Sequence, residues 1–285
     1  MQQIGQGIYA ETGYQGGNVG FVVTGEGVIL IDTPLSPLEA RQWRDEIARV
    51  TDQEVIYIIN TDYHPECVVG NHFFGAPVIA HESSWKKMKS YGDSFRQNLV
   101  DAFTSEPKAA AELKRLRVIT PQITLTDRME LHKGSKMLRL IHVGGHTPAS
   151  IIVHIPGDSV LFAGDVVVNG MHPLMKEADS KEWLDAMTYI RRPWVKAEVI
   201  VPGEGELCDK EVTKKLSHYI RRLRARIRGL YATGRTRAQA VASVAEMVDY
   251  FPVAAEEVGK AKQRFRANAE RIYEEMRASE TELTE

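Results

Sequence analysis

The sequence has few cysteines and no long apolar run. Two cysteines among 285 residues, Cys67 and Cys208, are too few for a disulfide-stapled fold and lack the paired spacing of a structural zinc site. No apolar run approaches the roughly 20 residues that span a bilayer. The first five residues also lack the basic start and the apolar stretch of a secretion signal. We therefore expect a cytoplasmic protein that does not enter a membrane.

An excess of charge of either sign is also absent. Lys and Arg total 36 against 38 for Asp and Glu, a formal charge of -2, so no field over the whole chain would attract nucleic acid or acidic lipid. The composition is 43% hydrophobic and 26% charged, which is typical of a globular protein that buries a core. We therefore expect no nucleic-acid or membrane partner.

The chain is predicted to begin with β-structure. Residues 17–34 contain two apolar, β-branched runs separated by Thr24-Gly25-Glu26-Gly27, a pattern typical of a hairpin. Residues 55–59 form a short apolar run and predict a buried strand. This strand leads directly into the polar segment 60–71. Functional residues often lie on such a loop, because a rigid strand positions it.

A helix is predicted over 37–50, where Ser36 would be the N-cap, Pro37 the first helical residue and Glu39 the partner in a capping box. The stretch 83–117 is mostly helical in pattern, with interruptions at Gly92 and Pro107. We expect this stretch to cover the neighbouring loops as a lid-like insertion. Further strands and one capped helix are predicted over 137–143, 150–155, 159–163, 199–201 and, for the helix, 179–190.

From Lys210 onward the pattern is wholly helical. Seven arginines lie between Arg221 and Arg237, and the Glu-rich last 30 residues could pair with them. We therefore favour a solvated helical surface over an anion-binding one. We divide the chain into a domain at 1–208 and a helical extension at 209–285, through which the protein could form a homo-oligomer. The β-rich halves with interspersed helices predict an α/β fold of two sheets packed face to face.

The polar segment after the strand at 55–59 carries four potential metal ligands within six residues. It reads Asn60-Thr61-Asp62-Tyr63-His64-Pro65-Glu66-Cys67-Val68-Val69-Gly70-Asn71. The alternation of Asp62, His64 and Glu66, followed by Cys67, would let several side chains point at one centre. Taken alone, this is a moderate signal for a metal site, because acidic loops are common.

Three further segments with potential ligands each follow a predicted strand. They are Gly144-Gly145-His146-Thr147-Pro148, Phe162-Ala163-Gly164-Asp165 and Pro202-Gly203-Glu204-Gly205. Together with the polar segment they resemble the metallo-β-lactamase-fold superfamily. The usual motifs of that superfamily are Asn-Thr-His-x-His-x-Asp-His-x-x-Gly-Asn, Gly-His-Thr, Gly-Asp and Pro-Gly-His-Gly. The resemblance runs from about residue 17 to residue 208.

The resemblance implies an αββα sandwich of two mixed sheets, with a metal site in the cleft at the loop ends and water-driven hydrolysis. His64, His146 and Asp165 match ligand positions of the family. Four other positions depart from the usual residue but keep a side chain able to bind metal: Asp62 and Cys67 replace histidines, Glu66 replaces an aspartate, and Glu204 replaces the last histidine. Retention of metal-binding residue types at every position favours a modified site over a decayed one.

The substitutions make the site more acidic. The usual set of five histidines and two aspartates carries two negative charges, whereas the set in this sequence carries five when fully ionised. Such crowding raises pKa values unless a cation is bound, so we expect one or two divalent metal ions. The carboxylates favour Mn²⁺ or Fe²⁺, while the imidazoles and the thiol keep Zn²⁺ open. A disulfide between Cys67 and Cys208 is the alternative to metal ligation or a free thiol at Cys67.

The expected chemistry is attack of a metal-bound hydroxide on an ester, thioester, lactone or amide of a small molecule. Glu66 is the candidate proton shuttle, Asp165 would bridge or orient the metal set, and His172 is a candidate substrate contact. Two alternatives remain open. One is a binding module that has lost hydrolysis, and the other is iron-dependent oxygen or sulfur chemistry.

Overall fold

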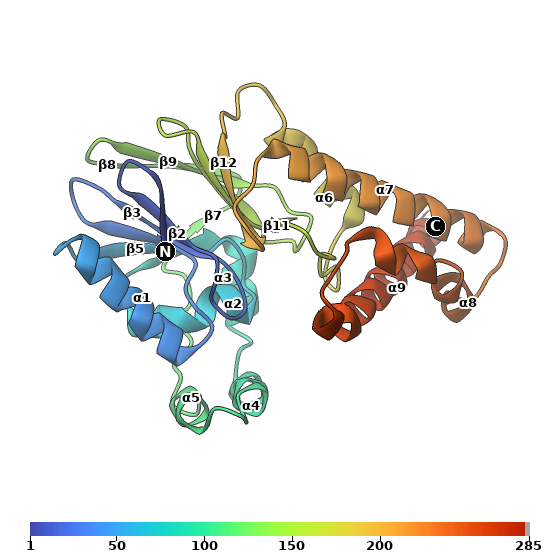
Figure 1. Cartoon of the computed structure of the whole chain (residues 1–285), viewed down its shortest axis with the longest axis horizontal. Helices are drawn as coiled ribbons and strands as arrows, with labels where there is room; N and C mark the ends of the chain where they lie inside the picture. The colour runs from blue at the N-terminus through green and yellow to red at the C-terminus, as the bar shows by residue number, and fades with distance from the viewer. Residues whose placement is uncertain (283–285) are drawn as a thin grey trace.

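The computed structural model describes residues 1–282, which fold into two β-sheets with helices outside them (Figure 1). The larger sheet has the order β1-β2-β3-β4-β5-β6-β7 (Gln2–Gly5, Ile8–Glu11, Val19–Val23, Val28–Ile31, Val55–Ile59, Val78–His81 and Ile123–Leu125). The smaller sheet has the order β12-β11-β10-β9-β8 (Val199–Glu204, Val160–Val168, Ile151–Ile155, Lys136–His142 and Arg128–Lys133). Both sheets mix parallel and antiparallel pairs, as predicted.

Strand direction brings the predicted site segments to one edge of the sandwich. β4, β5 and β6 run parallel, so the carboxyl ends of all three strands lie at the same edge of the sheet. The segment after β5 starts at this edge. In the smaller sheet β11 and β12 are parallel, with Gly164 opposite Pro202 and Val168 opposite Glu204. This register places Asp165 of β11 near the carboxyl end of β12. The sequence predicted both strands but ended β11 at 163 and β12 at 201, short of these residues.

Three apolar layers hold the sandwich together. The layer between the sheets includes Ile29, Ile59 and Phe162, all at most 2% exposed. On the outer face of the larger sheet, α1 (Pro37–Val50) buries Trp43 against that sheet. On the outer face of the smaller sheet, α6 (Ser180–Ile190) buries Trp183. The αββα order expected from the resemblance is therefore confirmed.

Helix boundaries follow the predicted signals, with one exception. α1 covers the predicted 37–50, but Ser36 makes no side-chain cap bond, and Glu39 accepts instead from the backbone N–H of Gln15, at 2.9 Å. The expected capping box is therefore wrong, because Glu39 binds a neighbouring loop. The predicted helical stretch 83–117 contains the helices α3, α4 and α5 (Glu82–Met88, Asp93–Ala102 and Pro107–Leu113). Gly92 precedes α4 and Pro107 starts α5, so both interruptions are confirmed.

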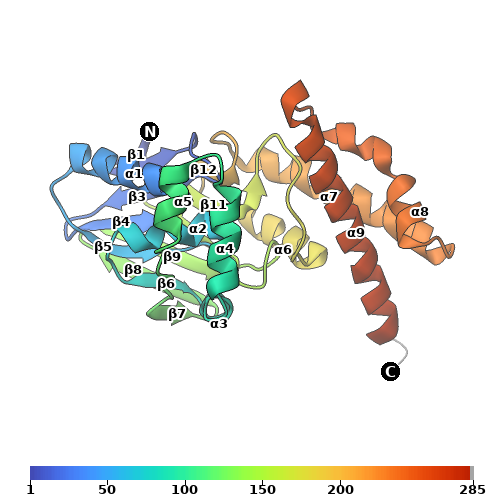
Figure 2. The same ribbon diagram turned by 90° about the horizontal axis from the view of Figure 1, so that it is seen from below.

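The C-terminal helices pack beside the smaller sheet (Figures 1 and 2). They are α7 (Lys210–Ala232), α8 (Arg237–Ala242) and α9 (Val258–Glu282), with short 3₁₀ turns at Ala245–Tyr250 and Ala255–Glu257. α9 crosses α7 in Figure 2, and the two share one apolar cluster with α6 and β11. Among the described residues, no helix is both long and apolar enough to cross a membrane.

Ion pairs cover the outside of this helical layer. Arg224 pairs with Glu275 at 2.8 Å, and Arg237 pairs with Glu274 at 3.2 Å. Pairing of the arginines with the glutamates near the chain end is thus confirmed for these two. The Arg237 pair is partly solvated and contributes little to stability, whereas the side chains of the Arg224 pair are only 16% and 11% exposed.

Candidate metal centre

The segment after β5 is held by buried side-chain hydrogen bonds. Asn60 donates its Nδ2 to the carbonyl of Cys67 at 2.7 Å, and Asn71 donates its Nδ2 to Oδ1 of Asn60 at 2.7 Å. Thr33, which follows β4, donates its hydroxyl to Oδ1 of Asn71 at 2.9 Å. The segment, including the short helix α2 (Pro65–Val68), is therefore rigidly positioned before any ligand binds.

Asp32 anchors the start of the segment. Its two carboxylate oxygens accept from the backbone N–H and the hydroxyl of Thr61, at 2.8 and 2.6 Å. Burial raises the pKa of Asp32 to about 7, although these two bonds act in the opposite direction. Asp32 also adopts a φ of 55°, a left-handed conformation that aspartate tolerates better than most residues. No role for Asp32 was predicted from the sequence.

Four ligand atoms from three segments converge at the edge of the sandwich. Nδ1 of His64 lies 3.1 Å from Nε2 of His146, which lies 3.4 Å from Oδ2 of Asp165. Nδ1 of His64 is also 3.6 Å from Oδ1 of Asp62. Two donors bound at about 2.1 Å in tetrahedral geometry are about 3.4 Å apart. The spacing and the mixture of imidazole and carboxylate therefore fit a divalent metal ion.

The protonation of His146 suits this role. Its side chain is 2% exposed, and burial lowers its pKa against the opposing effect of nearby carboxylates, first that of Asp62. A lowered pKa keeps the imidazole neutral at physiological pH. Neutral imidazole is the form that binds a metal ion.

Asp62 is already fully hydrogen-bonded within the protein. Oδ1 accepts from the backbone N–H groups of Tyr63 and His64, while Oδ2 accepts from the hydroxyls of Thr147 at 2.7 Å and Ser150 at 3.0 Å. A carboxylate offers about four lone-pair sites, and here each has a donor. Asp62 therefore ties the segment after β5 to the segment after β9, whether or not it also contacts a metal ion.

Asp165 of β11 and Glu204 of β12 come from paired strands. Burial and then the Glu204 carboxylate raise the pKa of Asp165. A Cβ at Gly203 would lie 2.0 Å from Oδ1 of Asp165, so only glycine lets β12 pass this close. The Pro-Gly of the fourth motif thus has a steric reason in the structure.

Glu204 is not free, because Arg264 of α9 contacts it. Nη2 of Arg264 lies 2.7 Å from Oε2 of Glu204, and Nη1 donates to the carbonyl of His172 at 3.2 Å. Burial alone would lower the pKa of Arg264, but the bond to Glu204 and its charge outweigh burial and raise it. Arg264 is the site residue that the sequence did not indicate, since it lies 60 residues beyond Glu204 on a helix with many other arginines.

The chain matches the model of a known protein family over more than half of its length. The model of the metallo-beta-lactamase superfamily matches residues 12–204. The chain belongs to this superfamily. The match contains the segments that carry all seven ligand positions named from the sequence and ends before the helical extension.

Individual relatives in the superfamily are distant. A metallo-beta-lactamase type 2 from Elizabethkingia meningoseptica is 22% identical over 197 residues, which are 68% of this chain and 70% of the relative. An acyl-coenzyme A thioesterase from Homo sapiens is 25% identical over 187 residues, 59% of this chain and 66% of the thioesterase. The match thus spans just under two thirds of the thioesterase.

Solved structures of the superfamily share the fold. A metallo-beta-lactamase from Pontibacter korlensis has a TM-score of 0.62 at 20% identity, covering 77% of this chain and 97% of that structure. A metallo-beta-lactamase family protein from Thermus thermophilus has a TM-score of 0.66 at 19% identity. The second match covers 96% of this chain and 94% of that structure, so it includes most of the helical extension.

The remaining predicted ligands of the superfamily motif lie beside the converging atoms. Among the described residues, the mutually close set, within 4.8 Å, comprises Asp62, His64 and His146. Cys67 is buried and lies with Sγ 4.0 Å from the hydroxyl of Thr61. Burial, and then nearby carboxylates, raise the pKa of the Cys67 thiol well above its ordinary value, so without a cation it is protonated.

Two other sequence assignments have a definite place in the structure. Glu66 lies in the first turn of α2, where a Cβ at Gly16 would be 3.2 Å from Cγ of Glu66, so the loop before β3 covers it. Both Cys67 and Cys208 are free thiols, so the structure contains no disulfide between them.

His172 lies between the superfamily domain and the extension. Its Nδ1 is 3.1 Å from the hydroxyl of Tyr219, and its Nε2 is 2.8 Å from the carbonyl of Val248. The side chain is 1% exposed, and both ring nitrogens have protein partners. These contacts attach the loop after β11 to α7 and its neighbours. A contact of His172 with substrate stays a prediction.

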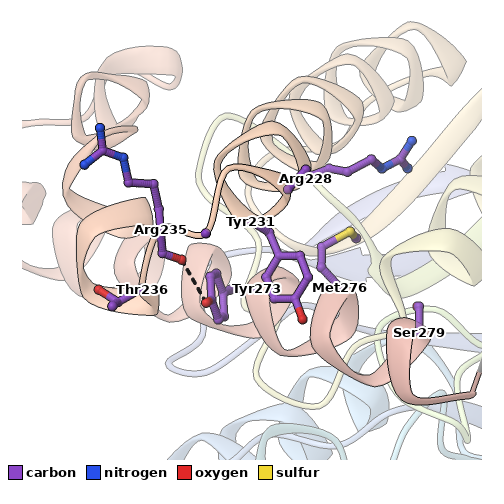
Figure 3. Close-up of a pocket in the computed structure, with 9 residues that line it drawn as sticks. Arg228, Tyr231, Arg235, Thr236, Tyr273, Met276 and Ser279 are labelled. Carbon is purple, nitrogen blue, oxygen red and sulfur yellow. Dashed lines mark hydrogen bonds between the residues drawn. The ribbon is translucent and has the colours of Figure 1, made fainter. Parts of the chain in front are cut away.

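Two cavities differ in their relation to the metal centre. One of about 250 Å³ is bordered by Glu204, Arg264 and Met171 and thus adjoins the centre. A larger one of about 730 Å³ lies in the extension between the end of α7 and α9 (Figure 3), where Tyr273 donates its hydroxyl to the carbonyl of Arg235. The larger cavity shares no residue with the centre.

Proposed function

We propose that the protein is a metal-dependent hydrolase that cleaves an ester, thioester, lactone or amide of a small molecule. The observation that carries this proposal is the group of potential ligand atoms on Asp62, His64 and His146, which all lie within 4.8 Å of one another, with Oδ2 of Asp165 3.4 Å from Nε2 of His146. These atoms come from three segments that are far apart in the sequence. Membership of the superfamily, with a lactamase and a thioesterase among the relatives, supports a metal-dependent hydrolase in general.

Each residue of the centre has a separate role in this proposal. His64 and His146 hold the ion through one imidazole nitrogen each, and Asp165 provides a carboxylate beside them. When bound, the ion lowers the pKa of water and polarises the substrate carbonyl. Asp62 keeps the two histidine-bearing segments in register through its four hydrogen bonds, so the two imidazoles are preorganised.

Glu66 is our candidate for moving the proton. Glu66 is the second residue of α2, directly after Pro65, so its carboxylate is carried by the same rigid segment as the imidazole of His64. Gly16, in the loop before β3, lies against the stem of the Glu66 side chain, and Glu66 is partly buried. A carboxylate in this place would accept a proton from the attacking water and return it to the leaving group.

The names of the relatives point to several classes of substrate. The relatives include proteins described as a lactamase, an acyl-coenzyme A thioesterase and a linear primary-alkylsulfatase, the last from a Pseudomonas species at 22% identity. The substrates that these names describe share a group that water can attack. The small cavity beside Glu204 suits a compact group near the reacting bond. Among the four carbonyl classes we place thioesters first in a substrate panel, because two relatives are named as thioesterases.

The test begins with metal content. Protein purified without chelator or histidine tag is analysed for metals and compared with the His64→Ala, His146→Ala double variant. We expect about one equivalent of a transition metal in the wild type and none in the variant. Visible absorption of the loaded protein would report iron, the metal of the alternative oxygen or sulfur chemistry.

Activity is then measured on thioesters, esters, lactones and amides with the metal-loaded protein. Glu66→Gln, which keeps the size of the side chain but cannot accept a proton, should reduce kcat by roughly 10²- to 10⁴-fold with little change in metal content. Loaded protein without turnover on the whole panel, and with Glu66→Gln indistinguishable from it, would contradict the proposal and favour a binding module.

A further inference from the structure

Arg264 brings a fixed positive charge from the extension to the metal centre. Its guanidinium bonds Glu204 at 2.7 Å, and both side chains are mostly buried, at 17% and 20% exposed. Glu204 stands at the position where the superfamily motif has its last histidine. Arg264 lies beyond residue 204, where the superfamily match ends. The pair is therefore a feature of this chain and not part of the matched motif.

Two further contacts fix the direction of the guanidinium. Nη1 donates to the carbonyl of His172 at 3.2 Å and lies 3.5 Å from Sδ of Met171. Both partners belong to the loop after β11, the strand that carries Asp165. Because three contacts hold a planar group, Arg264 has a defined position and is not a freely moving surface side chain.

Two carboxylates that could bind a second ion lie near Arg264. Glu204 bonds it directly, and Oδ1 of Asp165 lies against Gly203, the residue before Glu204. A second divalent ion that binds Glu204 would have to displace the guanidinium of Arg264 or bind next to this positive charge. Two cations this close together repel each other, and the repulsion is stronger in a partly buried site than in water.

From this juxtaposition we infer that Arg264 supplies the positive charge that a second metal ion would bring to Glu204, so the centre holds one divalent ion, at His64 and His146. The inference rests on the proposed metal-dependent function and adds the number of ions and the reason for it. Arg264 is then a positioning residue that keeps Glu204 occupied.

The experiment measures metal stoichiometry, independently of turnover. Metal-free wild type is titrated with Mn²⁺ and with Zn²⁺ in a calorimeter, and the number of bound equivalents is checked by elemental analysis after gel filtration. The variants are Arg264→Gln, which removes the charge, and Arg264→Lys, which retains it. Arg266→Gln is the matched control, because Arg266 lies on the same helix, is 73% exposed and pairs with Glu270.

We expect one equivalent in the wild type, in Arg264→Lys and in Arg266→Gln. Arg264→Gln should bind a second equivalent about tenfold or more tightly than the wild type does, because the competing cation is gone. Adding Glu204→Gln to Arg264→Gln should abolish this second equivalent, since its carboxylate ligand is lost. If Arg264→Gln fails to fold, as judged by circular dichroism, Arg264→Met replaces it with a neutral side chain of similar reach.

Two equivalents in the wild type would overturn the inference but leave the proposed function intact. One equivalent in a folded Arg264→Gln, with affinity equal to wild type, would overturn it as well. If the wild type binds no metal at all, this result would instead contradict the proposed function itself. The three failures therefore give different stoichiometries or affinities and can be told apart.

Discussion

At the scale of single residues, Asp62 shows how a substituted ligand can acquire a structural role. It is 1% exposed and accepts four hydrogen bonds, two of them from backbone N–H groups that no other described group is placed to satisfy. In a low-dielectric site, removing such an acceptor leaves buried donors without a partner. The contribution of Asp62 to folding should therefore be measurable without any metal.

We predict that Asp62→Leu lowers the free energy of unfolding of the metal-free protein by about 3 kcal/mol, because two buried N–H groups lose their acceptor. Asp62→Asn should cost about 1 kcal/mol, since the amide oxygen retains one acceptor. Urea unfolding followed by circular dichroism gives both values. A metal-free Asp62→Asn protein more stable than wild type would show that repulsion among the carboxylates outweighs these bonds.

Asp165→Asn serves as the control for this prediction. Burial and Glu204 raise the pKa of Asp165, and no backbone or hydroxyl group among the described residues donates to it. Its charge is therefore unfavourable in the metal-free fold. Asp165→Asn should leave the stability of the metal-free protein unchanged or raise it, in contrast to Asp62→Asn, while lowering metal affinity.

The sequence motifs identified His64 and His146 as potential ligands, because a motif can be recognised from the order of residues along the chain alone. His64 follows β5 of the larger sheet and His146 follows β9 of the smaller sheet, and the packing of the two sheets brings these positions together. Two of the hydrogen bonds to Asp62 come from the hydroxyls of Thr147 and Ser150, which approach Asp62 only when the two sheets pack together. The contact of Arg264 with Glu204 depends on how α9 crosses the extension. Neither feature leaves a local pattern that a sequence reader could use.

At the scale of elements, two histidines link strands of different sheets. His81 ends β6 and His142 ends β9, and their rings stack with centroids 3.9 Å apart. Nε2 of His81 lies 3.2 Å from the carbonyl of Thr126, and Nδ1 accepts from the backbone N–H of Ser83. These two contacts require the neutral ring. Burial and then His142 lower the pKa of His81, while Glu82 acts in the opposite direction.

This arrangement predicts an acid-sensitive contribution to stability. The pKa of His81 in the folded state is below its ordinary value of 6.5, so the folded state binds fewer protons than the unfolded state. The contribution of His81 is therefore fully present above pH 6.5 and is lost as the pH falls below it. We expect the Tm of the wild type to fall more between about pH 7.5 and pH 5.5 than that of His81→Gln.

The control for the pH series is His132→Gln, because His132 is 68% exposed on β8 and makes no stacked contact with another ring among the described residues. Its Tm should follow the wild type through the whole series. Equal slopes for His81→Gln and wild type would show that protonation of His81 is not coupled to folding.

Element boundaries were predictable where proline, glycine or a capping side chain determines them. Pro107 starts α5, Gly92 precedes α4, and Thr236 and Gln239 form a capping box at the start of α8. The predicted ends of β11 and β12 were too early, because these strands continue into residues of the metal centre whose polar side chains do not have a strand pattern. Function and local propensity conflict at those positions, and packing decides the outcome.

At the scale of the whole molecule, the extension shares a core with the sandwich. One continuous apolar cluster includes Val167 of β11, Trp183 of α6, Leu223 of α7 and Ile272 of α9, each with an exposed fraction of 0%. The boundary at residue 208 is a boundary of sequence pattern. Periodicity predicted amphipathic helices beyond it but contained no information on which surface they would cover.

Asn268 of α9 is the polar contact at the centre of this junction. It is fully buried, donates its Nδ2 to the carbonyl of Pro173 at 2.7 Å and accepts at Oδ1 from the backbone N–H of Met175 at 2.9 Å. Both partners lie in the loop between β11 and α6, which also carries the contacts of Arg264. The same helix therefore holds the loop and the charge beside the metal centre.

We predict that the sandwich and the extension unfold in one transition and that Asn268→Ala moves the whole transition. Two buried backbone groups would lose their partner, at a cost of about 2 kcal/mol. Trp43 of the sandwich and Trp183 at the junction are both fully buried, so fluorescence and circular dichroism together follow both parts during urea unfolding. Arg266→Gln, on the exposed side of α9, should leave the midpoint unchanged. Separate midpoints for the two signals would mean that the extension unfolds alone. The metal centre would then keep its histidines but lose Arg264 before the sandwich opens.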